Sequence, residues 1–305
     1  MFMNIVGHAD ILNFFEKATQ AGHLHHAYLF VGREGVGKRT VAQQITMQLF
    51  GQVDKPLHTN PDFFSLERGM NEKTGKTNKH VSIDQVHELR HFLQGKPFLH
   101  KQKVAIINDA ELLSRGAMNA LLKTLEEPRG HATVFLIASD EQALLETIRS
   151  RCQTLYFHPV SEENIYQDLL SLYIDDALAQ SIARDASGCP GLARAWVEEP
   201  DRYAWYQAEV ERCQALFGKP FHAQLALVED LFGKKEDHIA TRTTLGQILD
   251  IWQTVLREHY THPSSASRSR YDIVQTTDAI LSAKKGLLQN VHPRMLVENI
   301  LLTIS

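Results

Sequence analysis

The first half of the chain alternates between two patterns of hydrophobic positions. Short apolar runs are typical of buried strands, whereas apolar residues that recur every three or four positions are typical of amphipathic helices. Strand-like runs fall at residues 27–31, 62–67, 103–108, 133–139 and 153–158, and those at 27–31, 103–108 and 133–139 are almost continuously apolar. Helical spacing falls between them, at residues 40–50, 82–93, 114–128 and 141–151. Five strands that alternate with helices predict an α/β fold, a doubly wound parallel sheet covered by helices.

Polar residues and a proline mark the ends of two of these helices. Ser82 and Ser114 stand directly before the helical pattern begins, where a serine hydroxyl accepts a hydrogen bond from a free backbone N–H. Pro128 marks the end of the helix that Ser114 begins, because proline cannot continue the hydrogen-bond ladder of a helix.

The second half of the chain carries helical patterns only. Residues 161–198 predict short helices that break at the glycine–proline turn of residues 187–191. Two apolar stripes follow, formed by Leu245, Ile248, Leu249, Trp252 and Leu256 and by Leu296, Ile300 and Ile304. Between the stripes lies a serine-rich polar stretch at residues 262–270, where we expect Arg268 and Arg270 to be solvated.

These patterns divide the chain into three predicted domains. They are an α/β domain over residues 1–159, a small helical domain over 160–203 and an all-α domain over 204–305. The 305 residues are 43% hydrophobic and 22% charged, which is typical of a globular protein. The net charge of −4 offers no electrostatic basis for free-standing binding to nucleic acid.

Several sequence features bear on the compartment of the protein. Residues 1–20 have helical spacing without the basic segment and cleavage site of a signal peptide. No apolar run approaches the roughly 20 residues of a membrane span. The cysteines, Cys152, Cys189 and Cys213, are far apart and form no CxxC pair, which favours a reducing compartment. We therefore expect a cytoplasmic protein without a membrane partner.

The histidines do not form a recognisable metal motif. His87 and His91 would share one helix face, but no third ligand stands near them in the sequence. No stretch matches H-E-x-x-H or a Cys/His finger. We expect no metal site.

The stretch "GREGVGKRT" at residues 32–40 nearly matches a phosphate-binding loop. In such a loop, backbone N–H groups at a helix N-terminus cradle phosphates and a lysine reaches the β and γ oxygens. Gly32, Gly35, Gly37 and Lys38 are in place, with a predicted strand before them and a predicted helix after them. This context predicts a loop of phosphate-binding ancestry.

The magnesium side of that site is altered at two places. Arg39 stands where the pattern needs a Ser or Thr hydroxyl, and Thr40 is turned about 100° further around the helix. After the strand at 103–108, an active site needs acidic groups to hold magnesium and orient water. The chain has Asn108 and Asp109 there. Either these two residues simply end a strand or they keep a reduced role.

Several motifs together carry a family resemblance. They are "NALLKTLEEP" (119–128), "FLIAS" (135–139), "TIRSRC" (147–152), "HHAYLFVGREGVGK" (25–38), "NPDFFSLE" (60–67), "VSIDQVHEL" (81–89), "ASGCPGLARA" (186–195) and "NVHPRMLVENILLTI" (290–304). With these motifs the chain resembles the clamp-loader branch of the AAA+ proteins, and within it the delta-prime subunits of bacterial DNA polymerase III. The resemblance covers the chain through about residue 195 and is weaker beyond it.

The resemblance implies an architecture and a set of partners. The α/β domain would be an AAA+ module, the small helical domain a lid, and the C-terminal domain a collar that joins a five-membered ring. The partners would be the delta and gamma/tau subunits. The assembled ring would use ATP to place the sliding clamp on primed DNA. In this family the Arg of the SRC motif, here Arg151, reaches the ATP site of the neighbouring subunit, and Arg149 is the residue most easily confused with it.

Two departures from the family pattern are informative. Many relatives carry a four-cysteine zinc module before the "NPDF" strand, but residues 51–64 contain no cysteine, so we expect no zinc. ATP-hydrolysing relatives place an Arg inside the "SGCPG" turn, where this chain has Gly191. This substitution favours a delta-prime-like subunit.

The sequence therefore supports a first hypothesis and leaves alternatives. The first is a clamp-loader subunit that does not hydrolyse ATP and donates Arg151 to a neighbour. The second is an active gamma/tau-like ATPase in which Thr40 and Asp109 complete the magnesium site. A small-molecule kinase is a third, for which the helical C-terminal half offers no acceptor site. The residues leave open whether ATP or ADP still binds weakly at Lys38.

Overall fold

The computed structural model describes residues 5–51, 56–69, 78, 80–126, 131–232, 238–261, 270–289 and 291–304. Pro128 and Arg268, for which the sequence makes predictions, lie outside the described residues. The chain divides into two compact units, Met1–Ala195 and Trp196–Ser305. The predicted division into three domains stays a prediction, and its boundary after residue 203 falls within a helix, α9 (Pro200–Leu216).

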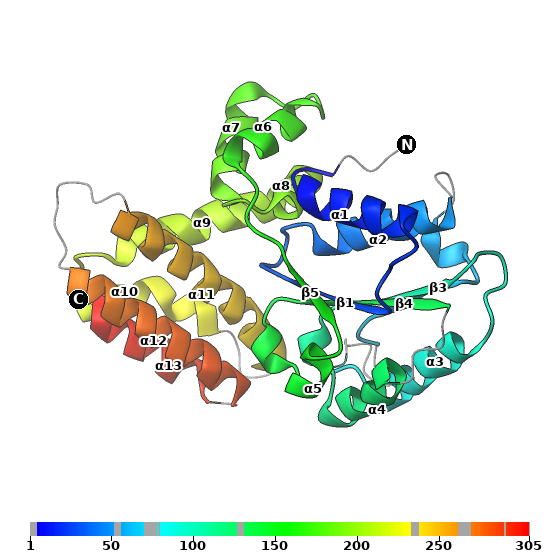
Figure 1. Ribbon diagram of the computed structural model, residues 1–305. Helices are drawn as coiled ribbons and strands as arrows, with labels where there is room; N and C mark the ends of the chain where they lie inside the picture. The colour runs from blue at the N-terminus through cyan, green and yellow to red at the C-terminus, as the bar shows by residue number, and fades with distance from the viewer. Residues whose placement is uncertain are drawn as a thin grey trace. The chain divides into compact units, whose positions relative to one another are not determined.

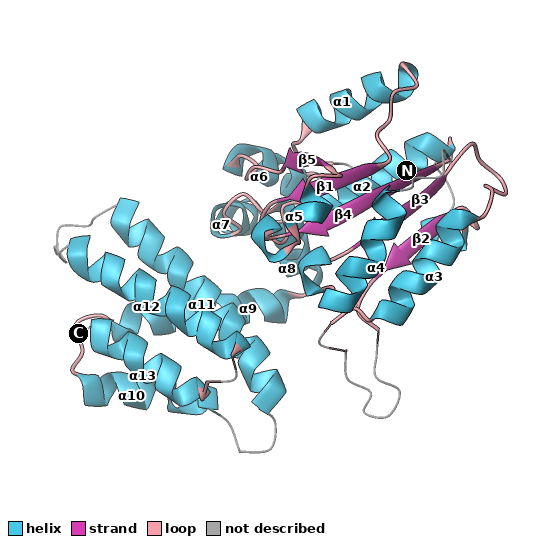
Figure 2. Ribbon diagram, turned by 60° about the horizontal axis from the view of Figure 1, so that its bottom comes forward, coloured by secondary structure: helices cyan, strands magenta, loops and turns pink. Residues whose placement is uncertain are grey.

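The first unit is built on a parallel sheet (Figure 2). Its strands are β1 (Ala27–Val31), β2 (Phe63–Leu66), β3 (Lys103–Ile107), β4 (Ala132–Ala138) and β5 (Gln153–Tyr156). They run in the order β2-β3-β4-β1-β5, with every neighbouring pair parallel. All residues of β1 and β3 are buried, as near-continuous apolar strands covered on both faces should be. The predicted strands and the predicted fold class are confirmed.

Helices cover both faces of this sheet (Figure 1). On one face lie α1 (Ala9–Gln20) and α2 (Lys38–Phe50), and on the other lie α3 (Ile83–Gln94), α4 (Arg115–Glu126) and α5 (Glu146–Arg149). Two hydrophobic cores follow from this layering. Phe15 of α1 packs with Tyr28, Phe30 and Phe135 on the first side, and Leu121 of α4 packs on the second.

The predicted helix starts are present. Ser82 and Gln85 form a capping box at α3, in which each side chain bonds the backbone N–H of the other residue. At α4, the Ser114 hydroxyl accepts a hydrogen bond from the Ala117 N–H at 3.2 Å. Local side-chain chemistry therefore sets where both helices begin.

One sequence prediction is wrong in detail. Residues 141–151 were expected to form a continuous helix, but a 3₁₀ turn (Glu141–Ala143) and the four-residue α5 replace it. Leu144 and Leu145 between them have extended backbones, with ψ of 148° and 137°. The break allows both Leu144 and Ile148 to enter the core beneath α4, and burial of these two side chains outweighs helix propensity.

The remaining described elements are helical. They are α6 (Glu162–Leu170), α7 (Asp176–Asp185), α8 (Pro190–Glu198), α9, α10 (Phe221–Val228), α11 (His238–Thr261), α12 (Arg270–Leu288) and α13 (Pro293–Ile304), with short 3₁₀ helices at Leu57–Thr59, Ala110–Leu112 and Glu229–Phe232. In the second unit Trp252 of α11 is fully buried in a core that includes Ile300 of α13. Among the helices that the structure describes, none combines the length and apolar character of a membrane crossing.

Candidate functional site

The glycine loop joins β1 to α2 at the carboxyl edge of the sheet. Gly35 and Gly37 have φ angles of 77° and 109°, which are left-handed values that favour glycine. Lys38 begins α2 and is only 7% exposed. The backbone therefore has the strand–loop–helix arrangement that places N–H groups around a phosphate.

The ammonium group of Lys38 is engaged by its own loop. Its Nζ donates hydrogen bonds to the carbonyl oxygens of Gly32 and Arg33, the latter at 2.8 Å. Burial lowers the pKa of Lys38, while the nearby carboxylates of Glu111 and Glu34 oppose that shift. Two of the three N–H donors of the Lys38 ammonium are thus directed at main-chain oxygens of the loop.

The N-terminal end of α8 contacts the same loop. The Gly191 N–H donates to the Gly35 carbonyl at 2.8 Å, and Arg33 Nη1 donates to the Ser187 carbonyl at 3.1 Å. A Cβ atom at Gly191 would lie 2.9 Å from the Gly35 oxygen. The position where ATP-hydrolysing relatives are expected to have Arg is therefore a close contact between two backbones.

We predict that Gly191→Ala destabilises the protein by about 1–2 kcal/mol, because the new methyl group meets a backbone oxygen that cannot turn away. Urea denaturation of the wild type and the variant measures the change. Gly246→Ala is the matched control, since Gly246 lies within α11 with open space around its Cβ position. It should stabilise the protein by about 0.5–1 kcal/mol. Equal stability of the Gly191 variant and the wild type would contradict the close contact.

An ion pair lies on the magnesium side of the loop. Arg39 Nη2 is 2.5 Å from Glu67 Oε1, and the same oxygen accepts a hydrogen bond from Asn108 Nδ2 at 3.0 Å. Asn108 is buried directly after β3, and Glu67 directly follows β2. A guanidinium and an amide thus share one carboxylate, while Thr40 lies half-buried one position further along α2.

Asp109, the second residue after β3, has an unusual backbone conformation. Asp109 follows β3 in a left-handed conformation with φ of 47°. Desolvation raises the pKa of Asp109, and the neighbouring Glu111 carboxylate raises it further. Glu111 in turn accepts hydrogen bonds from the backbone N–H of Ser139, at 3.0 Å, and from its hydroxyl.

This arrangement does not fit a magnesium–nucleotide complex. Magnesium takes oxygen ligands in near-ideal octahedral geometry, but Arg39 offers only donors and occupies the nearby Glu67. Binding of ATP or ADP by Gly32, Gly35, Gly37, Lys38, Thr40 and Asp109 stays a prediction.

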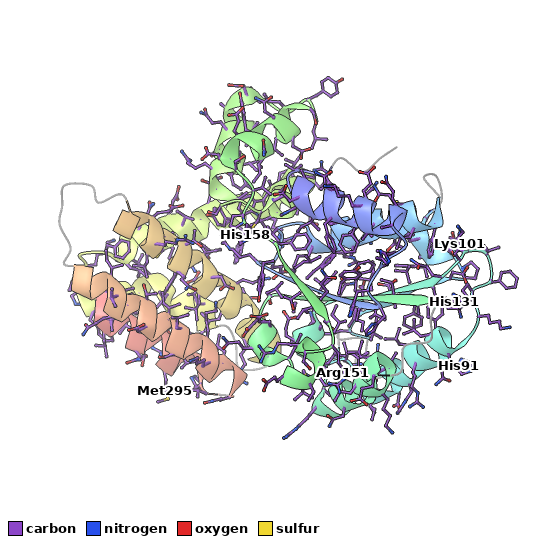
Figure 3. The ribbon with its side chains drawn as sticks, viewed as in Figure 1. His91, Lys101, His131, Arg151, His158 and Met295 are labelled. Carbon is purple, nitrogen blue, oxygen red and sulfur yellow. The ribbon has the colours of Figure 1, made fainter. Side chains whose placement is uncertain are left out.

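Arg151 lies apart from the loop, beside α5 and the end of α4 (Figure 3). Its Nη2 is 2.9 Å from Glu126 Oε1, and its Nη1 donates to the Thr147 carbonyl at 3.0 Å. The side chain is 35% exposed. The guanidinium is therefore oriented by its own chain while part of it remains accessible to a partner.

Sequence reasoning missed three residues of these sites. Glu67 is the carboxylate that Arg39 and Asn108 share; an inventory of acids at strand ends would have named Glu67, but not its pairing with these two residues. Glu126 stands in the "LEE" of a motif singled out for other reasons. His8 contacts the Val36 carbonyl through Nε2 at 2.8 Å, and no sequence signal points to this contact.

Comparisons with known proteins agree with this fold. Residues 7–161, just over half of the chain, match the family model described as DNA polymerase III, delta subunit. The chain is 30% identical over 198 residues to DNA polymerase III subunit tau of Escherichia coli, and 32% identical over 223 residues to subunit delta' of that organism. A gamma subunit-related protein from Thermotoga maritima has a TM-score of 0.50 at 18% identity, covering 94% of this chain and 97% of that one.

The matches cover unequal shares of the relatives. The tau match spans 61% of this chain and 31% of tau, and the delta' match spans 66% of this chain and 63% of delta'. At 18% identity the Thermotoga likeness shows the fold alone. The AAA+ fold that the sequence motifs predict is confirmed.

Proposed function

Because the chain belongs to the DNA polymerase III delta subunit family, we propose that it is a delta-prime-like clamp-loader subunit. It does not hydrolyse ATP itself and supplies Arg151 to the ATP site of a neighbouring subunit. Its partners are the delta and gamma/tau subunits. It reaches the sliding clamp and primed DNA through the assembled complex.

The observation that carries this proposal is the shared carboxylate beside the glycine loop. Arg39 replaces the magnesium-binding hydroxyl, and Glu67 and Asn108 pair with each other there. Lys38 is held by loop carbonyls, and Gly191 contacts the loop directly. Four separate features thus disfavour ATP hydrolysis at this chain's own glycine loop.

Arg151 is suited to act on a neighbour. A planar and permanently charged guanidinium stabilises the charge that develops on a transferring γ-phosphoryl group. Its exposed ion pair with Glu126 contributes only about 0–1 kcal/mol, so an incoming phosphate can replace it. The Thr147 carbonyl holds the other guanidinium nitrogen in place.

We predict that the isolated chain shows no magnesium-dependent ATP hydrolysis. We also predict that Lys38→Ala changes ATP turnover of the reconstituted complex by less than about twofold, because turnover takes place at the neighbouring subunits and this chain's own loop has Arg39, paired with Glu67, in place of the magnesium-binding hydroxyl. Phosphate release by the chain alone and by the complex measures both. The matched control replaces the corresponding loop lysine of a gamma/tau subunit with alanine, and this change should reduce turnover strongly.

The similarity to tau supports a second candidate, an active gamma/tau-like ATPase. In that case Thr40 and Asp109 would complete the magnesium site. Hydrolysis by the isolated chain that requires magnesium and is lost in Lys38→Ala would establish this candidate in place of the first.

A further inference from the structure

Exposed apolar residues lie in the turn between α6 and α7 and in the first turn of α7, two helices that run side by side (Figure 1). Leu172 is 45% exposed, Tyr173 is 99% exposed and Leu178 is 44% exposed. We call these three residues the turn cluster. Single exposed leucines are ordinary on protein surfaces, but three large apolar side chains within seven residues form a local patch, and such patches mark interaction sites.

Tyr173 is held in an unfavourable backbone conformation. Its φ is 60°, and its N–H donates to the Leu170 carbonyl at 3.0 Å, closing the turn after α6. Glycine or asparagine usually takes this position after a helix, and a bulky residue there is an outlier that carries strain. The ring is almost fully in water, so it contributes little packing within this chain. Fold stability therefore does not explain a tyrosine here.

The turn is held firmly on both sides. The Tyr166 hydroxyl of α6 donates to a carboxylate oxygen of Asp176, and Asp175 caps α7 by accepting from the Leu178 N–H at 3.3 Å. Arg194 of α8 pairs with the buried Asp168 of α6. The cluster is thus presented on an ordered support, which lowers the entropy lost on binding.

The charge around the cluster indicates what it binds. Residues 161–183 contain no Lys or Arg, and Asp175 and Asp176 lie within the turn region, exposed to solvent. An acidic surface repels the phosphates of nucleic acid and attracts a basic protein surface. Tyrosine is also among the residues that most often dominate protein interfaces.

We propose that the turn cluster is a docking site for another protein subunit of the same assembly, which offers an apolar pocket rimmed by Lys or Arg. The inference rests on the proposed function for the identity of that assembly. Tyr173 enters the pocket, Leu172 and Leu178 flank it, and Asp175 and Asp176 face the basic rim.

Variants of Tyr173 test this proposal without damaging the fold. Tyr173→Gly removes the ring and suits the left-handed backbone, so its melting temperature should equal or exceed that of the wild type. Its affinity for purified gamma/tau and delta subunits should fall about tenfold or more, since loss of a central interface aromatic has effects of this size. Tyr173→Phe keeps the ring and should bind nearly as the wild type does. Gln180→Ala, at an exposed position of α7, is the control.

The outcomes separate the inference from the proposed function. If Tyr173→Gly assembles with wild-type affinity, the docking proposal is wrong, and the assembly itself still supports the function. If the wild type does not assemble with these subunits at all, both proposals fall. Sedimentation of the isolated chain tests whether a second copy of this chain binds at the turn cluster instead. Self-association that is lost in Tyr173→Gly would assign the cluster to a second copy of this chain and overturn the proposal.

Discussion

Replacing Arg151 with alanine is expected to reduce ATP turnover at the neighbouring subunit's site by about 10³-fold or more, because arginines acting in trans contribute roughly 10³–10⁵ to such rates. The measurement is DNA-stimulated phosphate release by the reconstituted complex, made with a partner whose other ATP sites are disabled. The chain itself should remain folded, since the exposed pair of Arg151 with Glu126 contributes at most about 1 kcal/mol.

Two control variants make this result specific. Arg149→Ala removes the neighbouring arginine, which lies two residues earlier, and should leave turnover close to that of the wild type. Glu126→Ala breaks the ion pair but keeps the guanidinium. If Arg151 acts only through local pairing, Glu126→Ala will reproduce the loss. Unchanged turnover in Arg151→Ala would show that the trans role is wrong.

Replacing Asp62 with alanine is expected to destabilise the protein by about 3 kcal/mol, because several hydrogen bonds to one charged group are lost together. Asp62 is fully buried after the short helix that precedes β2. Its carboxylate accepts the backbone N–H groups of Phe98, Leu99 and His100 at 2.6, 2.7 and 2.8 Å. The loop before β3 therefore depends on this single side chain. Urea denaturation near pH 7 measures the loss.

The same carboxylate predicts a dependence on pH. Burial opposes ionisation of Asp62, but the three N–H donors outweigh it and hold the pKa of Asp62 below the ordinary value of 3.8. Its contribution to stability is therefore fully present above that value and is lost as the pH falls through the lower folded pKa. The stability difference between the wild type and Asp62→Asn should shrink below about pH 4. A difference that stays constant from pH 7 to pH 3 would contradict the assigned hydrogen bonds.

Much of the first unit could be predicted because its signals are local. The strand at 103–107 is apolar except for Lys103, and such a run predicts a buried strand from its own residues alone. The helix starts at Ser82 and Ser114 depend on residues three positions away. The segment at 141–151 failed because its helix-forming residues are overridden by burial of Leu144 and Ile148 beneath α4.

The candidate sites were predicted only in part, for a related reason. Arg39 and Asn108 were recognised as departures from an ATPase pattern, but nothing in the sequence pairs them with Glu67. The contact between Gly191 and Gly35 joins residues far apart in the chain. Such pairs depend on how α8 packs against the loop, which no local pattern records.

The amino-acid sequence by itself therefore determined the order of strands and helices, the AAA+ fold, the glycine loop and the choice of Arg151 as a candidate. The order of elements and the glycine loop follow from hydrophobic period and a short motif, whereas the AAA+ fold and the choice of Arg151 follow from the resemblance of several motifs to the clamp-loader family. The tertiary structure alone decided that Lys38 is held by loop carbonyls, that Arg39 pairs with Glu67, that Arg151 rests on Glu126, and that Tyr173 is exposed in a strained turn. The pairs of Arg39 with Glu67 and of Arg151 with Glu126 join residues far apart in the sequence, which meet only once the chain is packed. The contacts of Lys38 and the exposure of Tyr173 depend on the backbone conformation of the loop and the turn, which the folded chain fixes.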